Sequence, residues 1–329
     1  MISKQGKLYR IQDGEATANH LYGAIDLGSN TFRLLIGEVR NGHCTPRVKQ
    51  LHNVRIGEAL HRTGQINDQA MERATNVLTE FKAVINRHQP IAVRVCGTAA
   101  LRIATNRDQL LKHAENILGI KAEVIEGRQE AHLSGFGAFA CMKKKPTSPV
   151  LLADIGGGSS ELMIATPTDT KPEITKPTSI PLGAVNMSEL FLSSAKPTKN
   201  ELSNMASHIE AVMAPAITAM NGIPNTMVGI GGTATALAAL DCNLSTYDSE
   251  RIQDHKIPQD NLAALLTKLG CLIAADRNKL PGLANGRGEI IIGGLMIFIT
   301  LLKHVSCPQL TVSDGGLLEG ILLSIADSA

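Results

Sequence analysis

The chain carries one long internal repeat, and this repeat restricts the fold more than any other feature. A shift of 128 residues places residues 24–36, AIDLGSNTFRLLI, on residues 152–164, LADIGGGSSELMI. Each copy consists of an apolar strand, an aspartate, a Gly-rich turn and a second apolar strand, which predicts a hairpin. Because helical patterns follow both copies, the repeat predicts a duplicated α/β fold.

Composition excludes several classes of protein. The 329 residues are 43% hydrophobic and 19% charged, as is typical of an ordered globular protein. A net charge of +2 gives no strongly basic surface, so nucleic acid is not expected as a partner. The longest apolar run, residues 290–302, is shorter than the ~20 residues of a membrane span, so we expect a buried helix and no membrane role. Six scattered cysteines predict buried free thiols, and with no signal peptide in the sequence they predict a cytoplasmic protein.

Apolar spacing predicts the elements between and after the hairpins. Helices are expected at residues 67–89, 108–118 and 199–220, and strands at residues 91–96 and 121–125. Residues 166–179 are polar with three prolines and predict an exposed hairpin or loop.

Three Gly-rich turns predict phosphate-binding sites. The first turn (residues 28–31) and the second turn (residues 156–159) would face a cleft between the two halves, where bare glycines let backbone N–H groups approach phosphate oxygens. An aspartate precedes each turn, Asp26 or Asp154, and can hold a metal ion or orient a water. The third turn (residues 231–233) opens an Ala-rich helix, and a helix N-terminus favours an anion.

Seven segments together resemble the Ppx/GppA phosphatase family, which comprises exopolyphosphatases and guanosine pentaphosphate phosphohydrolases. They follow the order of the family and cover about residues 21–325. The segments are AIDLGSNTFRLLI (24–36), CGTAALRIATN (96–106), VIEGRQEAHL (124–133), LLADIGGGSSELMI (151–164), VGIGGTATALAAL (228–240), LPGLANGRGEIIIGGL (280–295) and VSDGGLLEG (312–320). The chain resembles the short, two-domain form.

This resemblance implies a duplicated actin-like ATPase fold, also described as ribonuclease H-like, with two lobes around a phosphate-binding cleft. We expect lobe I to comprise residues 21–130 and about 312–329, and lobe II to comprise residues 131–311. Residues 1–20 are polar and are expected to form a flexible tail. The resemblance also implies a homodimer.

The resemblance assigns the catalytic acids. It implies that Glu130 is the general base for an attacking water. Asp154 and Glu161 match an acidic pair that would share a hydrated Mg²⁺ or Mn²⁺, and their positions on either side of a hairpin turn agree with this. Asp26 would lie opposite Asp154 and orient water or metal.

Further residues are predicted to bind phosphate. They are small or polar residues of the three turns, one threonine before a helix, and two arginines, whose guanidinium forks match phosphate oxygens. The set is Gly28, Ser29, Asn30, Thr31, Arg33, Thr98, Arg102, Gly156, Gly157, Gly158, Ser159, Gly231, Gly232 and Thr233. Thr98 is also expected to be the N-cap of its helix.

The chain departs from the family around its functional residues. Gln129 stands where a glutamate is usual, and His132 and Leu318 stand where arginines are usual. Arg128 occupies a variable position, and Glu126 a position that is usually Ser. Whether these changes reduce activity is open at this point.

The resulting hypothesis is a phosphoanhydride hydrolase that releases orthophosphate from polyphosphate or a guanine alarmone such as guanosine pentaphosphate, with Mg²⁺ assistance. A run of lysines, residues 143–145, would either extend a polyphosphate groove or form a solvated loop. Two alternatives remain: a catalytically weak polyphosphate or alarmone sensor, and an actin-like ATPase or kinase.

Overall fold

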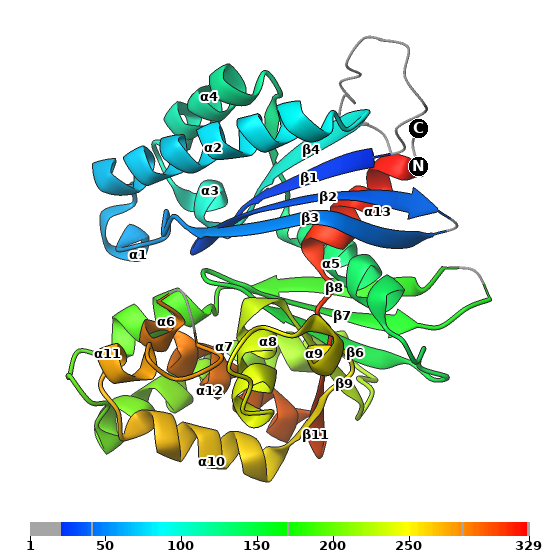
Figure 1. The fold of residues 1–329 in the computed structure, drawn as a ribbon. Coiled ribbons are helices and arrows are strands. Elements are labelled where there is room, and N and C mark those ends of the chain that lie inside the picture. Colours follow the sequence, from blue (N-terminus) through cyan, green and yellow to red (C-terminus); the bar gives the residue numbers. More distant parts are fainter. Residues whose placement is uncertain (1–20, 41, 170, 284–285, 328–329) are drawn as a thin grey trace. The chain divides into compact units, whose positions relative to one another are not determined.

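The structure is a computed structural model that describes residues 21–40, 42–169, 171–283 and 286–327 (Figure 1). The described chain divides into two compact units. Unit 1 comprises the described residues of Met1–Glu126 and Leu317–Ala329, and unit 2 comprises those of Gly127–Gly316. The predicted tail, residues 1–20, lies outside the described residues.

Unit 1 is built on a five-stranded sheet with the order β3-β2-β1-β4-β5. Three strands form an antiparallel meander, and the last two run parallel to β1. The strands are β1 (Leu21–Leu27), β2 (Thr31–Arg40), β3 (His43–Asn53), β4 (Ala92–Gly97) and β5 (Ala122–Val124).

The helices of unit 1 are α1 (Leu60–Thr63), α2 (Asp68–His88), α3 (Ala99–Ile103), α4 (Arg107–Leu118) and α13 (Leu317–Ala326). Asn67 begins α2, because its side chain accepts a hydrogen bond of 2.8 Å from the Ala70 amide. The apolar face of α2 buries Leu78 and Phe81 in the core of the unit. Helix α13 comes from the far end of the sequence and packs on β1, β2, β3 and β4.

Unit 2 contains a six-stranded sheet with the order β10-β11-β9-β6-β7-β8. Its strands are β6 (Val150–Ile155), β7 (Ser160–Thr166), β8 (Glu173–Ile180), β9 (Met227–Ile230), β10 (Lys256–Pro258) and β11 (Gln309–Val312). Its helices are α5 (Gly127–Cys141), α6 (Ala184–Phe191), α7 (Lys199–Met220), α8 (Gly231–Asp241), α9 (Ser249–Ile252), α10 (Gln259–Gly270), α11 (Ala274–Arg277), the 3₁₀ turn η1 (Arg287–Glu289) and α12 (Ile291–His304).

The two sheets repeat one topology, which confirms the predicted duplication. Strands β8-β7-β6-β9-β11 have the same order and directions as β3-β2-β1-β4-β5. The register is also repeated, since Asp26 pairs with Arg33 across β1 and β2, and Asp154 pairs with Glu161 across β6 and β7. Each unit is therefore one copy of the ribonuclease H-like α/β layer, and the chain has the duplicated actin-like ATPase fold.

The apolar run at residues 290–302 forms most of α12, a buried helix, as predicted. Leu295 and Phe298 are fully buried there, and α12 packs on α6, α7, α8 and α10. In the described ranges, no helix is long and apolar enough to cross a membrane.

The hairpin or loop expected at residues 166–179 is a hairpin, because β8 pairs antiparallel with β7. Pro177 is tolerated in β8 since β8 is an edge strand. One expectation needs correction. The six cysteines are free thiols as predicted, but only Cys96 and Cys307 are buried, and Cys271 is exposed.

The start of α6 packs tightly on the second turn, and this contact provides a test of the fold. A Cβ atom on Gly183 would lie 2.3 Å from the carbonyl oxygen of Gly157. We expect Gly183→Ala to lower the free energy of unfolding by about 1–3 kcal/mol in urea titrations, because backbone has to move. Gly270→Ala is the control, since its nearest neighbour, Leu202 Cδ1, is 3.9 Å away. Equal midpoints for the two variants would contradict this packing.

Candidate active site

The first and second turns have the same construction. The Gly28 amide donates to the Thr31 carbonyl over 3.1 Å, and the Gly156 amide donates to the Ser159 carbonyl over 3.0 Å. A Cβ atom would lie 2.8 Å from the Thr31 oxygen at Gly28, and 3.1 Å from the Ser159 oxygen at Gly156. Both tight turns therefore favour glycine at this first position.

In unit 1, neighbouring backbone holds the carbonyl groups of the first turn. The Gly57 amide donates to Ser29 O over 2.8 Å, and the amides of Val54 and Arg55 donate to Asn30 O over 3.1 and 2.9 Å. Within the described residues the Asn30 amide itself donates to no protein acceptor. The first turn thus keeps an N–H group available for an anion.

In unit 2, amides at the start of α6 hold the carbonyl groups of the second turn. The amides of Ala184 and Val185 donate to the carbonyls of Gly156 and Gly157, both over 2.9 Å. Over the part of the chain that the structure covers, the amides of Gly157 and Gly158 have no protein acceptor. Such adjacent free amides are suited to phosphate oxygens.

The third turn is the N-terminus of α8. Helix α8 begins at Gly231, whose φ of +82° favours glycine, and no side chain caps this end. Its first amides are therefore available to an anion. The hydroxyl of Thr233, predicted to contact phosphate, donates to the Ile155 carbonyl over 3.1 Å.

The N-cap prediction for Thr98 is confirmed in position only. Thr98 occupies the N-cap position of α3, but its side chain makes no capping hydrogen bond. The hydroxyl of Ser29 instead accepts a bond of 3.2 Å from the Ala100 amide. Ser29 therefore joins the first turn to α3. The side chain of Arg102, on α3, donates to Ile125 O over 3.2 Å.

Asp26 and Arg33 form an ion pair within unit 1. The guanidinium contacts Asp26 Oδ2 at 2.6 Å through Nη2 and at 2.8 Å through Nε. Burial raises the pKa of Asp26, and the charge and hydrogen bond of Arg33 oppose this rise. Asp26 Oδ1 is buried and accepts no hydrogen bond from any described residue. Arg33, predicted to bind phosphate, thus neutralises Asp26, and one aspartate oxygen remains as an acceptor.

Unit 2 brings three predicted acids together. Asp154 and Glu161 are cross-strand partners at the mouth of the hairpin, and α5 supplies Glu130. All three are buried, and Glu161 is only 1% exposed. Burial raises the pKa of Glu161 well above its usual value, and the negative charges of Glu130 and Asp154 raise it further.

Serines support Glu161. Its Oε1 atom accepts hydrogen bonds of 2.7 Å from the hydroxyls of Ser159 and Ser179. These bonds lower the pKa of Glu161 but do not cancel the rise. Ser159, predicted as a phosphate ligand, is therefore also a donor to an acid. Ser179 was missed because it lies at the far end of the hairpin at residues 166–179, where no sequence motif marks it as a site residue.

The third turn lies against Asp154. A Cβ atom on Gly231 would be 2.4 Å from Asp154 Oδ1, so the carboxylate contacts the N-terminus of α8. The partial positive charge of a helix N-terminus stabilises an ionised aspartate there. The acids and the second and third turns thus belong to one region of unit 2.

Comparisons with known proteins show the family of the chain. The family model of the Ppx/GppA phosphatase family matches residues 35–329. The chain belongs to the Ppx/GppA phosphatase family. The predicted enzyme class, a hydrolase acting on phosphoanhydride bonds, is thereby confirmed.

Individual members of the Ppx/GppA family show the extent of the similarity. Exopolyphosphatase 2 of Mycobacterium tuberculosis (strain CDC 1551 / Oshkosh) is 31% identical, over 92% of this chain and 98% of that protein. A guanosine-5'-triphosphate,3'-diphosphate pyrophosphatase of Aliivibrio fischeri (strain ATCC 700601 / ES114) is 27% identical, over 95% of this chain and 60% of that protein. The crystal structure of an exopolyphosphatase from Cytophaga hutchinsonii superposes with a TM-score of 0.84 at 27% identity, covering 94% and 98% of the two chains.

The unusual residues of this Ppx/GppA chain do not surround Glu130. Arg128, Gln129 and His132 are exposed on α5, whereas Glu130 is buried. Leu318 is buried in α13, where an arginine would have to leave water. Two side chains of the lysine run bind backbone carbonyls of unit 2. Lys145 donates to Phe139 O and Ala140 O at the end of α5, and Lys143 donates to Glu250 O on α9.

Arg287 is a functional candidate that sequence reasoning missed. Its Nη1 donates to the Gly232 carbonyl, and a Cβ atom on Gly232 would be 2.8 Å from Arg287 Nη2. The guanidinium thus lies at the third turn, beside the helix N-terminus that contacts Asp154. The only signal in the sequence is an arginine between two glycines, in a segment that the family resemblance includes.

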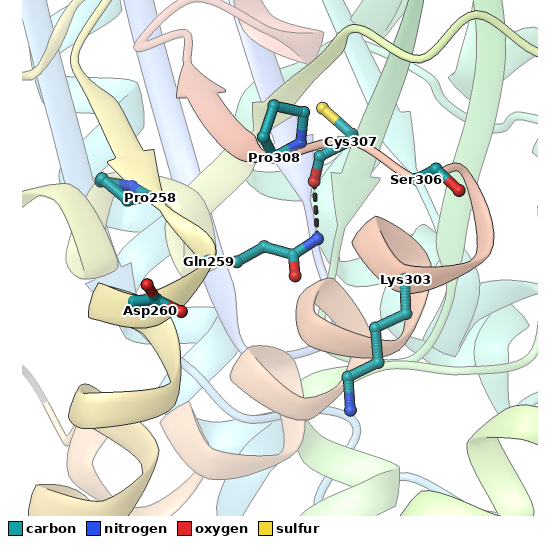
Figure 2. A pocket seen from close by; sticks show the side chains of 7 residues that line it. All are labelled: Pro258, Gln259, Asp260, Lys303, Ser306, Cys307 and Pro308. Atoms are coloured by element: carbon teal, nitrogen blue, oxygen red, sulfur yellow. Dashed lines mark hydrogen bonds between the residues drawn. The ribbon is translucent and has the colours of Figure 1, made fainter.

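A surface pocket of about 540 Å³ in unit 2 is a different site (Figure 2). It is lined by Pro258, Gln259, Asp260, Lys303, Ser306, Cys307 and Pro308. None of these is a predicted site residue, and the Gln259 amide is already bonded to Cys307 O at 2.6 Å. The pocket is therefore not part of the candidate active site.

The raised pKa of Glu161 predicts a stability that depends on pH. The folded protein keeps a proton on Glu161 at pH values where the unfolded chain has released it, so stability falls as pH rises through this range. We expect Glu161→Gln to unfold with a free energy higher by on the order of 1 kcal/mol near pH 8. The gain should shrink toward pH 5. Urea titrations at both pH values measure it.

The matched control is Glu115→Gln, the same change at an exposed glutamate of α4, which should alter stability little. A Glu161→Gln variant that is less stable than the parent near pH 8 would contradict this prediction. It would show that the ionised Glu161 carboxylate stabilises the folded protein.

Proposed function

We propose that the protein hydrolyses terminal phosphoanhydride bonds and releases orthophosphate from inorganic polyphosphate, guanosine pentaphosphate, or both. The names of its relatives, exopolyphosphatases and guanosine-5'-triphosphate,3'-diphosphate pyrophosphatases, support these substrates. The observation that carries the proposal is the buried group of Glu130, Asp154 and Glu161 in the same unit as two turns with free amides.

The turns and arginines bind the charged substrate. The amides of Gly157 and Gly158 and the N-terminus of α8 would hold phosphate oxygens in unit 2, and Arg287 would add a cation there. In unit 1 the Asn30 amide and Arg102 would hold another phosphate. Preorganised donors of this kind stabilise the charge that develops on the leaving phosphate.

Glu130 is proposed as the general base. Glu130 is the only acid at positions 128–132, and it is buried, whereas the other polar residues there are exposed. Its charge acts on Glu161. A carboxylate in this setting can take the proton of a water as the water attacks the terminal phosphorus. Asp26 would orient water, because its Oδ1 atom remains an open acceptor.

The residues of unit 2 fit a divalent cation. Asp154 and Glu161 place two carboxyl groups at one hairpin mouth. Burial, together with the charges of Glu130 and Asp154, raises the pKa of Glu161, and a bound cation would oppose this rise. No set of three or more His, Cys, Asp or Glu side chains in the described ranges is arranged to hold a metal. Mg²⁺ needs fewer protein ligands, since it is commonly held by one or two carboxylates together with waters and substrate phosphates. When bound, it would neutralise phosphate charge.

The proposal is tested by orthophosphate release. We expect Mg²⁺-dependent release from polyphosphate or guanosine pentaphosphate, and a loss of about 10²–10⁴-fold in kcat for Glu130→Gln, because the base is removed while the shape is kept. Glu115→Gln is the control and should keep full activity. The ranking of short polyphosphate, long polyphosphate and guanosine pentaphosphate identifies the substrate.

Three results would contradict parts of this proposal. Release that survives in Glu130→Gln would reject Glu130 as the base. Binding of either substrate without release by the parent protein would favour a sensor, and transfer of phosphate from ATP to an acceptor would favour a kinase.

A further inference from the structure

Arg277 is a buried arginine of unit 2 with no part in the reaction described above. It is the last residue of α11 and is 4% exposed. Its Nε donates to Gly288 O over 2.5 Å, and its Nη1 donates to Leu272 O over 2.7 Å and to Leu269 O over 3.4 Å. Across the described ranges no carboxylate forms an ion pair with it, so the guanidinium is committed to backbone carbonyls.

Gly288 is held on both of its polar groups. Its carbonyl accepts from Arg277, and its amide donates to Asn278 Oδ1 over 2.8 Å. A Cβ atom on Gly288 would lie 2.6 Å from the Asn278 nitrogen and 2.8 Å from Arg277 Cβ. The end of α11 therefore fixes the backbone of η1 tightly.

The next residue toward the N-terminus on η1 is Arg287, at the third turn. Its guanidinium donates to Gly232 O, at the start of α8. A long arginine side chain loses rotational freedom when it binds phosphate, and a fixed backbone reduces this cost. Gly288 is the chain neighbour of Arg287, so its fixed backbone limits the positions that the Arg287 guanidinium can reach.

We propose that Arg277 is a positioning residue for substrate binding, because its contacts with Gly288 and the end of α10 hold Arg287 at the third turn. This inference rests on the proposed phosphate-binding role of that turn. Lysine cannot replace Arg277, since an ammonium group lacks the planar fork that reaches several carbonyls at once. The alternative is that Arg277 only closes the end of α10 and contributes stability alone.

A double-mutant cycle separates these two roles. The Kd of tripolyphosphate is measured by calorimetry for Arg277→Lys, Arg287→Ala and the double variant, all in a Glu130→Gln background so that turnover does not consume the ligand. We expect Arg277→Lys to weaken binding about tenfold when Arg287 is present, and to have no further effect when Arg287 is alanine. Equal losses in both backgrounds would overturn the inference.

A second variant covers the case in which Arg277→Lys fails to fold. Asn278→Ala removes the acceptor of the Gly288 amide but leaves Arg277 in place, and it should show the same dependence on Arg287. Independent effects in this second cycle would also overturn the inference. A parent protein that binds tripolyphosphate but hydrolyses neither polyphosphate nor guanosine pentaphosphate would reject the proposed function and leave the cycle readable. A parent protein that hydrolyses these substrates but does not bind tripolyphosphate would overturn the inference alone.

Discussion

The structure depends on a cross-strand pair at the mouth of each of its two hairpins. In unit 1 the aspartate faces an arginine, Asp26 with Arg33, and the pair is neutral. In unit 2 the aspartate faces a second acid, Asp154 with Glu161, and both are buried. One repeat of the sequence therefore pairs an acid with a base and the other pairs two acids, in the same backbone frame.

The groups around the acidic pair reduce the cost of burying it. Ser159 and Ser179 donate to Glu161, and the N-terminus of α8 lies against Asp154. These donors do not restore the pKa of Glu161 to its usual value. This burial is a cost to stability that a functional site can carry, and the proposed divalent cation would reduce it.

Much of the fold could be predicted from the sequence, because the repeat and the helical spacing are local signals. The hairpins, α2, α7 and α12 all follow from them. Strand β3 was missed, since its residues are mostly polar and half-exposed, and α5 contains several glycines that obscure its period.

The site was predicted less completely, since its contacts join distant segments. Asp26 and Arg33 have the same spacing as Asp154 and Glu161, so their pairing could have been found from the repeat. Nothing local indicates that Ser29 caps α3, or that Arg287 reaches the third turn.

Manganese binding tests the central claim, that the acidic hairpin holds a divalent cation and its neutral counterpart does not. Free Mn²⁺ is measured by electron paramagnetic resonance during titration of the parent, Asp154→Asn and Asp26→Asn. The same change is thus made in both copies of the repeat. We expect a Mn²⁺ site that is lost in Asp154→Asn and retained in Asp26→Asn, because Arg33 already neutralises Asp26. Retention of the site in Asp154→Asn, or equal loss in both variants, would contradict the account.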